Sequence, residues 1–236
     1  MKKIVDLKRR AAIKAVEFIE SGMILGLGSG STAWFALEAI GKRIQEGQLK
    51  SIIGIPSSKQ TARDAQKLGI PIGSLADHPE IDLTIDGADE VDPDLNLIKG
   101  GGGALLREKI LAQNSRRCVI VVDESKLSIS LGVKKVVPVE VVSFGSYPVL
   151  KYLKTLSADA RLRLNEKDEP FETDQGNFII DCKFRQITQP ERLAKQLKER
   201  AGIIEHGLFL GLATDVIVAG EEGVQHLVAE RKGQGI

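Results

Sequence analysis

Apolar residues recur in two alternating patterns over the first 135 residues of the chain. Short apolar runs predict buried strands, and stretches with apolar residues three or four positions apart predict helices. The first helix is predicted over residues 6–20, with Asp6 able to cap its start. The elements after it are strands at 23–27, 51–55, 81–85 and 119–122, separated by helices at 32–44, 62–68 and 105–113. Apolar strands that alternate with helices are typical of sheets covered on both faces, so the pattern predicts an α/β fold with a doubly wound, mostly parallel sheet.

The pattern changes near residue 136. The elements there are an apolar stretch at 136–142, a helix at 148–156, strands near 161–164 and 178–183, and a helix at 190–200. This order indicates a second, smaller α+β unit of ferredoxin-like type, and Pro138 suggests where the chain leaves the first domain. The apolar strand at 215–219 is expected to return to the first sheet. We therefore predict an α/β catalytic domain of residues 1–133 plus about 207–236, and a small α+β domain of about 134–206.

Polar residues follow each of the four predicted parallel strands. The four polar groups are residues 29–32, 57–59, 86–89 and 123–126. Open α/β sheets bind ligands in the crevice outside the carboxyl ends of their strands. One pocket could therefore gather segments that lie about a hundred residues apart in the sequence.

The segment 86–108 concentrates groups suited to moving protons on an anionic ligand. It holds Asp86 and Asp89, with Glu90 on what reads as a turn with little apolar cover, and then Lys99 and four glycines at 100–103. Clustered acids disfavour full ionisation, and a lysine can stabilise a developing oxyanion while successive glycine amides cradle it. The alternatives are that the aspartates are ordinary turn residues and that Lys99 is a solvated surface residue.

Glu108 interrupts an apolar face of its predicted helix. Its neighbours three and four positions away are Ala104, Leu105, Leu111 and Ala112. Desolvation there would raise the pKa of Glu108 toward neutrality, as a general base requires, whereas the positive start of the helix would oppose that change. A salt bridge to a distant partner is the alternative interpretation.

The glycine-rich turn at 26–32 lies between a predicted strand and a helix, where free amides attract phosphate. A dinucleotide-binding fold would need an acid after the second strand to hold a ribose hydroxyl, but residues 56–59 are Pro, Ser, Ser and Lys. The serine and threonine hydroxyls suit a phosphate monoester instead. A purely structural turn is the other interpretation.

Composition narrows the classes of partner. The chain has 236 residues, 42% of them hydrophobic, and a net charge of +1 without a Lys/Arg block, so it can bury a sizeable core and nucleic acid is not an expected partner. Neither an apolar signal core nor a run of 18 apolar residues occurs, so we expect a cytoplasmic protein without a membrane partner. Cys118 and Cys182 are expected to be buried free thiols. The three histidines lack ligand spacing, so no metal site is expected.

These motifs, in this order across nearly the whole chain, resemble the type A ribose-5-phosphate isomerases. The family's first loop looks like residues 29–32, its D-G-A-D turn is 86–89, its K-G-G-G run is 99–102, and its proton-abstracting glutamate falls on Glu108. The substrate-binding residues implied by the resemblance are Ser29, Gly30, Ser31, Thr32, Asp86, Gly87, Ala88, Asp89, Lys99, Gly100, Gly101, Gly102 and Lys126.

The resemblance implies interconversion of D-ribose 5-phosphate and D-ribulose 5-phosphate through an enediolate, in the non-oxidative branch of the pentose phosphate pathway, without metal or cofactor. Glu108 would shuttle the proton between C1 and C2, and Asp86 would assist ring opening and proton movement between the sugar oxygens. Asp89 would orient the substrate, and Lys99 would offset oxyanion charge. The resemblance also implies a homodimer or homotetramer, with the small domain at the oligomer interface.

Two other classes are kept as alternatives. A sugar-phosphate sensor on a similar fold would bind such ligands without turnover and would need a DNA-binding helix-turn-helix, for which there is no room before Met23. An acyl-CoA transferase of related architecture would use a glutamate as nucleophile and form a covalent thioester. Trapping of an acyl-enzyme would separate that class from an isomerase.

Overall fold

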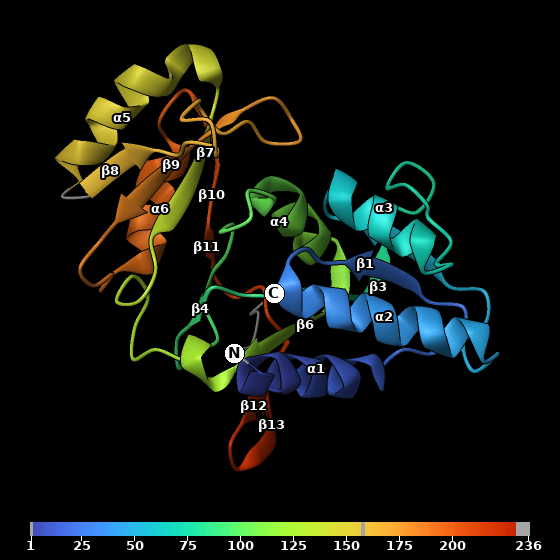
Figure 1. The fold of residues 1–236 in the computed structure, drawn as a ribbon. Helices are drawn as coiled ribbons and strands as arrows, with labels where there is room; N and C mark the ends of the chain where they lie inside the picture. The colour runs from blue at the N-terminus through green and yellow to red at the C-terminus, as the bar shows by residue number, and fades with distance from the viewer. Residues whose placement is uncertain (1, 157–158, 230–236) are drawn as a thin grey trace, which may run out of the picture.

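The protein is built around a six-stranded sheet, as seen within residues 2–156 and 159–229, which the computed structural model describes. The strand order is β13-β12-β6-β3-β1-β2, and every neighbouring pair is parallel except β12 and β13. The strands are β1 (Ile24–Leu27), β2 (Ile53–Pro56), β3 (Ile81–Gly87), β6 (Ser115–Asp123), β12 (Asp215–Gly220) and β13 (Gly223–Val228). This confirms the predicted α/β fold class, including the return of the last apolar strand to the first sheet (Figure 1).

Helices cover both faces of this sheet. The helices are α1 (Lys2–Val16), α2 (Ser31–Gln45) and α3 (Lys59–Lys67) on one face and α4 (Leu105–Gln113) on the other. Strand β6 shows the division, because Val119 and Val121 pack into the core under α1 and α2 whereas Ile120 and Val122 pack into the core on the opposite face. Alternation along a strand buried on both faces accounts for its continuous apolar run at 118–122.

The first helix begins and ends earlier than predicted. Asp6 lies inside α1 and does not cap it, and α1 ends at Val16. The amides of residues 17, 18 and 19 then bond to carbonyls only three residues back, which tightens the chain into a turn. Ile19 is nevertheless buried in the same core as the helix, so its apolar periodicity continued past the end of the helix.

A second, antiparallel sheet forms the smaller unit. Its strands are β7 (Val137–Val141), β8 (Asp159–Leu162), β9 (Phe178–Lys183) and β10 (Ile203–His206), in the order β10-β7-β9-β8, and its helices are α5 (Ser146–Thr155) and α6 (Pro190–Lys198). The chain order βαββαβ with this strand order is the ferredoxin-like arrangement, which confirms that prediction. Strand β10 was missed because Glu205 and His206 are buried in it and interrupt its apolar pattern. The predicted domain ranges include residues 1, 157–158 and 230–236, which lie outside the described residues.

A small three-stranded sheet lies beside the two larger ones. It contains β4 (Glu90–Val91), β5 (Leu97–Ile98) and β11 (Leu208–Phe209), and short 3₁₀ turns η1 (Glu124–Lys126) and η2 (Ser143–Gly145) follow β6 and β7. The expectation that Glu90 sits on a turn with little apolar cover was wrong. Glu90 is fully buried and accepts hydrogen bonds from the amides of Gly132, Lys134 and Lys135, so it anchors the chain between the two domains. Within the described residues, no helix has the length and apolar character needed to cross a membrane.

Candidate active site

Lys99 lies at the centre of a buried cluster of charges. Its Nζ is 3.0 Å from Asp86 Oδ2 and 3.3 Å from Glu108 Oε2, and it donates a 2.5 Å hydrogen bond to the carbonyl of Gly87. The three residues are only 2–6% exposed. They come from the end of β3, the chain after β5 and the first turn of α4. The fold thus assembles three of the four predicted catalytic side chains, and Lys99 is not a surface residue.

Burial decides the protonation of Glu108. Desolvation raises the pKa of this carboxyl to about 8, against the opposing effect of Lys99 and with a further rise from Asp86. Although Lys99 Nζ is within ion-pair distance, Oε2 accepts no hydrogen bond from the described residues. Glu108 is therefore an ion-pair partner of Lys99, as the salt-bridge alternative expected, and it also remains a candidate general base. Glu108 thus has a buried carboxyl oxygen, 3.3 Å from Lys99 Nζ, that the described residues leave without a hydrogen bond.

The pKa values of Asp86 and Lys99 are both raised, but for different reasons. Burial raises the pKa of Asp86 above its ordinary value, and Lys99 and two backbone amides oppose that rise. Burial would lower the pKa of Lys99, but the charges of Asp86 and Glu108 outweigh burial and raise it. Lys99 is therefore a permanent cation between two carboxyls that both hold their protons more tightly than in water.

The first glycine loop packs directly on Asp86. The amides of Ser29 and Gly87 donate to Asp86 Oδ1 at 3.1 and 2.7 Å. A Cβ atom on Gly28 would lie 2.3 Å from the same oxygen, so only glycine allows this approach. The carboxyl ends of β1 and β3 thus meet as the sequence predicted.

Asp89 is joined to the second glycine run. Its Oδ2 accepts a 2.8 Å hydrogen bond from the amide of Gly101, and Asp89 is half-buried rather than enclosed. The run turns sharply at Gly100 and Gly103, where φ is +98° and +82°. These left-handed conformations explain why glycine stands at both ends of the run. The structure therefore bonds Asp89 to the amide loop, and its charge still contributes to the raised pKa values of Lys99 and Glu108.

A cluster of hydroxyls lies beside the charged groups. Ser29 Oγ lies 2.7, 3.0 and 2.9 Å from the hydroxyls of Ser57, Ser58 and Thr61. Ser58 also caps α3 by accepting from the amide of Thr61 at 2.9 Å. The sequence pointed to residues 57–59 only as a polar strand end, and the signal for Thr61 was no more than a hydroxyl in the first turn of a helix.

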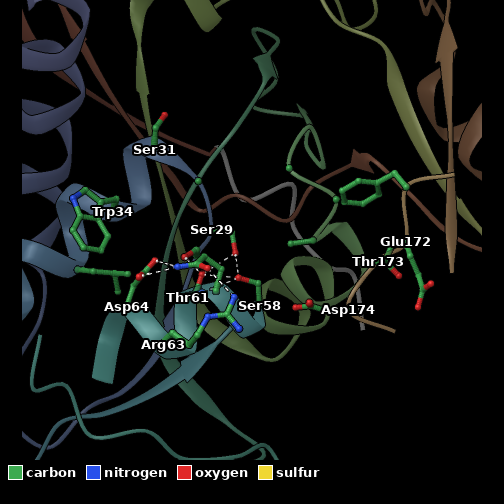
Figure 2. A pocket seen from close by; sticks show the side chains of 18 residues that line it. Ser29, Ser31, Trp34, Ser58, Thr61, Arg63, Asp64, Glu172, Thr173 and Asp174 are labelled. Atoms are coloured by element: carbon green, nitrogen blue, oxygen red, sulfur yellow. Dashed lines mark hydrogen bonds between the residues drawn. The ribbon is translucent and has the colours of Figure 1, made fainter. Parts of the chain in front are cut away.

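A cavity of about 480 Å³ opens beside these groups. Its lining includes Ser29, Gly30 and Ser31 from the first loop, Gly102 and Gly103 from the second, and segment 171–174 from the small domain. Figure 2 shows the hydroxyls of Ser29, Ser58 and Thr61 converging on one side, with Thr173 and Asp174 on another. Asp86, Lys99 and Glu108 do not line this cavity themselves; the lining residue Ser29 bonds to Asp86, and the lining residue Ala104 accepts from the Glu108 amide.

The start of α2 is an uncapped helix end next to this cavity. Its N-cap residue is Gly30, which has no side chain to bond the first amides, and Lys8 of α1 donates a 2.9 Å hydrogen bond to Ser31 Oγ. Free amides and a cation together make an anion site. Lys8 was missed because an isolated lysine on an amphipathic helix carries no local signal.

Three predicted substrate-binding residues remain: Thr32, Ala88 and Lys126. Thr32 is buried, and a Cβ on Gly87 would come within 3.9 Å of its Cβ, so the first loop touches the Asp86–Asp89 turn. Ala88 packs at the edge of the core below β6. Lys126 lies half-buried in η1 and does not line the cavity, so its contact with substrate stays a prediction. Within residues 2–156 and 159–229, no group of three or more His, Cys, Asp and Glu side chains is arranged to hold a metal ion.

Comparison with known proteins assigns the chain to a family. The family model of ribose 5-phosphate isomerase A (phosphoriboisomerase A) matches residues 53–223. The chain is 52% identical to the ribose-5-phosphate isomerase A of Chloroflexus aurantiacus over 226 residues, which are 96% of this chain and 95% of that protein. It is equally identical to the protein of the same name from Desulfatibacillum aliphaticivorans over 223 residues, 94% of this chain and 97% of that one.

Solved structures of ribose-5-phosphate isomerases superpose on nearly the whole chain. A D-ribose-5-phosphate isomerase in complex with phospho-erythronic acid superposes with a TM-score of 0.94 at 42% identity, covering 95% of this chain and 99% of that one. The ribose 5-phosphate isomerase A of Methanocaldococcus jannaschii gives a TM-score of 0.90 at 38% identity, with 94% and 98% covered. The chain belongs to the ribose-5-phosphate isomerase A family and is an aldose-ketose isomerase of the pentose phosphate pathway.

Proposed function

We propose that this chain interconverts D-ribose 5-phosphate and D-ribulose 5-phosphate with Glu108 as the base that carries the proton. The supporting observation is a buried carboxyl whose pKa is about 8 and whose Oε2 accepts no hydrogen bond from the described residues. A base with a pKa near the working pH transfers protons most effectively. Glu108 takes the proton from C2 of the open-chain aldose, which leaves an enediolate, and returns it to C1 to form the ketose.

Lys99 and Asp86 handle the sugar oxygens. The Lys99 ammonium, held by Asp86 and Glu108, offsets the charge that develops on the enediolate oxygen. Asp86, with a raised pKa, moves the proton between the two oxygens and assists ring opening. Asp89, fixed by the Gly101 amide, orients the substrate. This scheme needs no cofactor or metal ion.

The phosphate end of the sugar is assigned to the start of α2. The support is the set of unbonded amides behind Gly30, with the hydroxyl of Ser31 and the ammonium of Lys8 beside them. Lys126 is proposed as a second cation for the substrate.

Isotope exchange tests the assignment of the base. The protein is incubated with ribose 5-phosphate in deuterated buffer containing EDTA, beside a Glu108→Gln variant, and NMR follows ribulose 5-phosphate and deuterium at the exchanging carbon. We expect turnover and exchange in the parent, and the loss of both in the variant. Tight binding without turnover in the parent would overturn the proposal and favour the sensor class. Undiminished exchange in the variant would remove Glu108 from its role.

The oligomeric state and domain ranges are proposed together. We assign residues 1–133 plus about 207–236 to the catalytic domain and about 134–206 to a small domain that forms the interface of a homodimer or homotetramer. Phe144 in η2 and Tyr147 in the first turn of α5 support this assignment, because these aromatic side chains are 97% and 73% exposed. Light scattering on a Phe144→Ser/Tyr147→Ser variant tests it, with dissociation expected.

We also propose a cytoplasmic location without nucleic-acid or membrane partners. Buried free thiols at Cys118 and Cys182 suit a reducing compartment, and a net charge of +1 offers little attraction to nucleic acid. Fractionation of cells that express the chain tests the location.

A further inference from the structure

Arg163 of the small domain reaches across to the second glycine run. It follows β8, and its Nη1 donates two hydrogen bonds of 3.1 Å, one to the carbonyl of Gly100 and one to that of Gly101. Its side chain is 14% exposed. A single guanidinium nitrogen therefore holds two successive peptide groups of a loop that, being glycine throughout, has little stiffness of its own.

Asp181 fixes the guanidinium from the other side. The bond from Arg163 Nε to Asp181 Oδ2 is 2.8 Å and that from Nη2 to Oδ1 is 2.5 Å, which makes a bidentate pair. Because the carboxylate balances its charge, Arg163 adds little net charge to the neighbouring Lys99 cluster. Its effect on the loop is therefore one of geometry.

The peptide geometry converts this anchoring into an orientation of amides. In a trans peptide the C=O and the following N–H point in opposite directions. The carbonyls of Gly100 and Gly101 face Arg163, so the amides of Gly101 and Gly102 face away from it. The Gly101 amide accordingly reaches Asp89 Oδ2 at 2.8 Å. Gly102 lines the cavity, and a Cβ at that position would meet open space.

Phe171 holds the other end of the run. Its amide donates a 2.9 Å hydrogen bond to the carbonyl of Arg163, and its ring lies 5.7 Å from the guanidinium. A Cβ on Gly103 would lie 2.5 Å from the Phe171 ring, so the ring packs directly on the glycine. Arg163 and Phe171 thus fix both ends of the loop that faces the cavity.

We propose that Arg163 is a positioning residue for the isomerase reaction: it sets the Gly100–Gly101–Gly102 peptides so that one amide holds Asp89 and the next faces the reacting sugar. This inference rests on the proposed function for the roles of Asp89 and the glycine amides. Asp181 keeps the guanidinium in the required orientation. The catalytic loop of the large domain is therefore organised by a side chain of the small one.

Kinetics of an Arg163→Ala variant test the proposal. Loss of an aligned donor or a shift of about 1 Å costs roughly 10- to 100-fold, so we expect kcat to fall by that factor and KM to change much less. Arg161→Ala is the matched control, because Arg161 lies in β8 two residues before Arg163, with its side chain 79% exposed and in contact with Asp159. Arg161→Ala should keep the parent kcat and KM.

Rescue separates positioning from a merely structural link between domains. Added guanidinium at concentrations far below those that unfold the protein should restore part of the kcat of Arg163→Ala. The same addition should leave Arg161→Ala unchanged. An Arg163→Lys variant, which cannot bridge the two carbonyls and Asp181 together, should fold and remain impaired in kcat. A normal kcat in Arg163→Lys, or a lowered melting temperature with unchanged kcat in Arg163→Ala, would overturn the proposal.

A measurement without substrate keeps this inference distinct from the proposed function. In protein labelled with ¹⁵N-glycine, Arg163→Lys should shift the Gly101 and Gly102 amide signals and speed hydrogen exchange at Gly101. Unchanged glycine signals would contradict the anchoring. An inactive parent chain whose glycine signals still depend on Arg163 would overturn the isomerase assignment while supporting the anchoring.

Discussion

Replacing Glu108 by glutamine tests the electrostatics of the site as well as its chemistry. Glutamine keeps the shape of the side chain and removes its ionisation. Removal of a general base lowers kcat by roughly 10²- to 10⁴-fold. Because burial dominates at this position, the same change should also stabilise the folded protein at neutral pH.

The size of that stabilisation follows from the pKa. An unfolded chain ionises this carboxyl near 4.5, whereas the folded protein retains the proton until about pH 8. A group whose pKa is raised by folding contributes stability below pH 4.5 and loses it as the pH rises through 8. One pH unit is worth about 1.4 kcal/mol, so the buried Glu108 costs on the order of 3 kcal/mol at pH 7. Removal of this cost should raise the melting temperature by roughly 6 to 12 °C for a domain of this size.

Calorimetry of the parent and Glu108→Gln proteins at pH 5, 7 and 8 measures this difference. We expect the two melting temperatures to converge at pH 5 and to separate as the pH rises. Glu80→Gln is the control, because the Glu80 side chain is 77% exposed and, within the described part of the chain, forms its ion pair with the surface residue Arg116. A Glu108→Gln protein that is inactive yet no more stable than the parent at pH 8 would refute burial as the dominant influence on this carboxyl.

Three further changes probe other parts of the site. Lys99→Met should abolish turnover and destabilise the protein by about 3 kcal/mol at pH 8, because it leaves buried carboxyls without their cation; urea unfolding measures this, and unchanged stability would contradict the ion cluster. Lys8→Ala should raise KM several-fold with kcat nearly unchanged if Lys8 binds the phosphate equally in the ground and transition states; steady-state kinetics would oppose this role if kcat alone fell. Gly28→Ala should displace Asp86 and lower both activity and melting temperature, whereas Gly102→Ala, with open space for its Cβ, should keep the melting temperature of the parent; equal melting temperatures for both variants would argue against the close packing at Gly28.

The carboxyl ends of parallel strands illustrate what could be predicted from the sequence. Predicted strands of four or five residues, each followed by polar groups, required those groups to meet at one sheet edge. Ser29 and Asp86 are accordingly in contact, and Ser57 lies 2.7 Å from Ser29. The helix with Glu108 on its apolar face was also predictable, because that periodicity is local. The start and end of α1 were not, because Ile19 joins the same core after the helix has ended.

By itself, the sequence determined the order of strands and helices, the two glycine loops and the candidate acids and lysine, since each depends on the local spacing of residue types. Only the tertiary structure decided that Lys99 is buried between Asp86 and Glu108, that burial raises the pKa of Glu108, and that Glu90 turns away to anchor the chain between domains. The contacts of Lys8 with Ser31 and of Arg163 with the glycine run are likewise tertiary. The physical reason is that desolvation and ion pairing depend on distances between side chains that are remote in sequence, and local pattern carries no information about those distances.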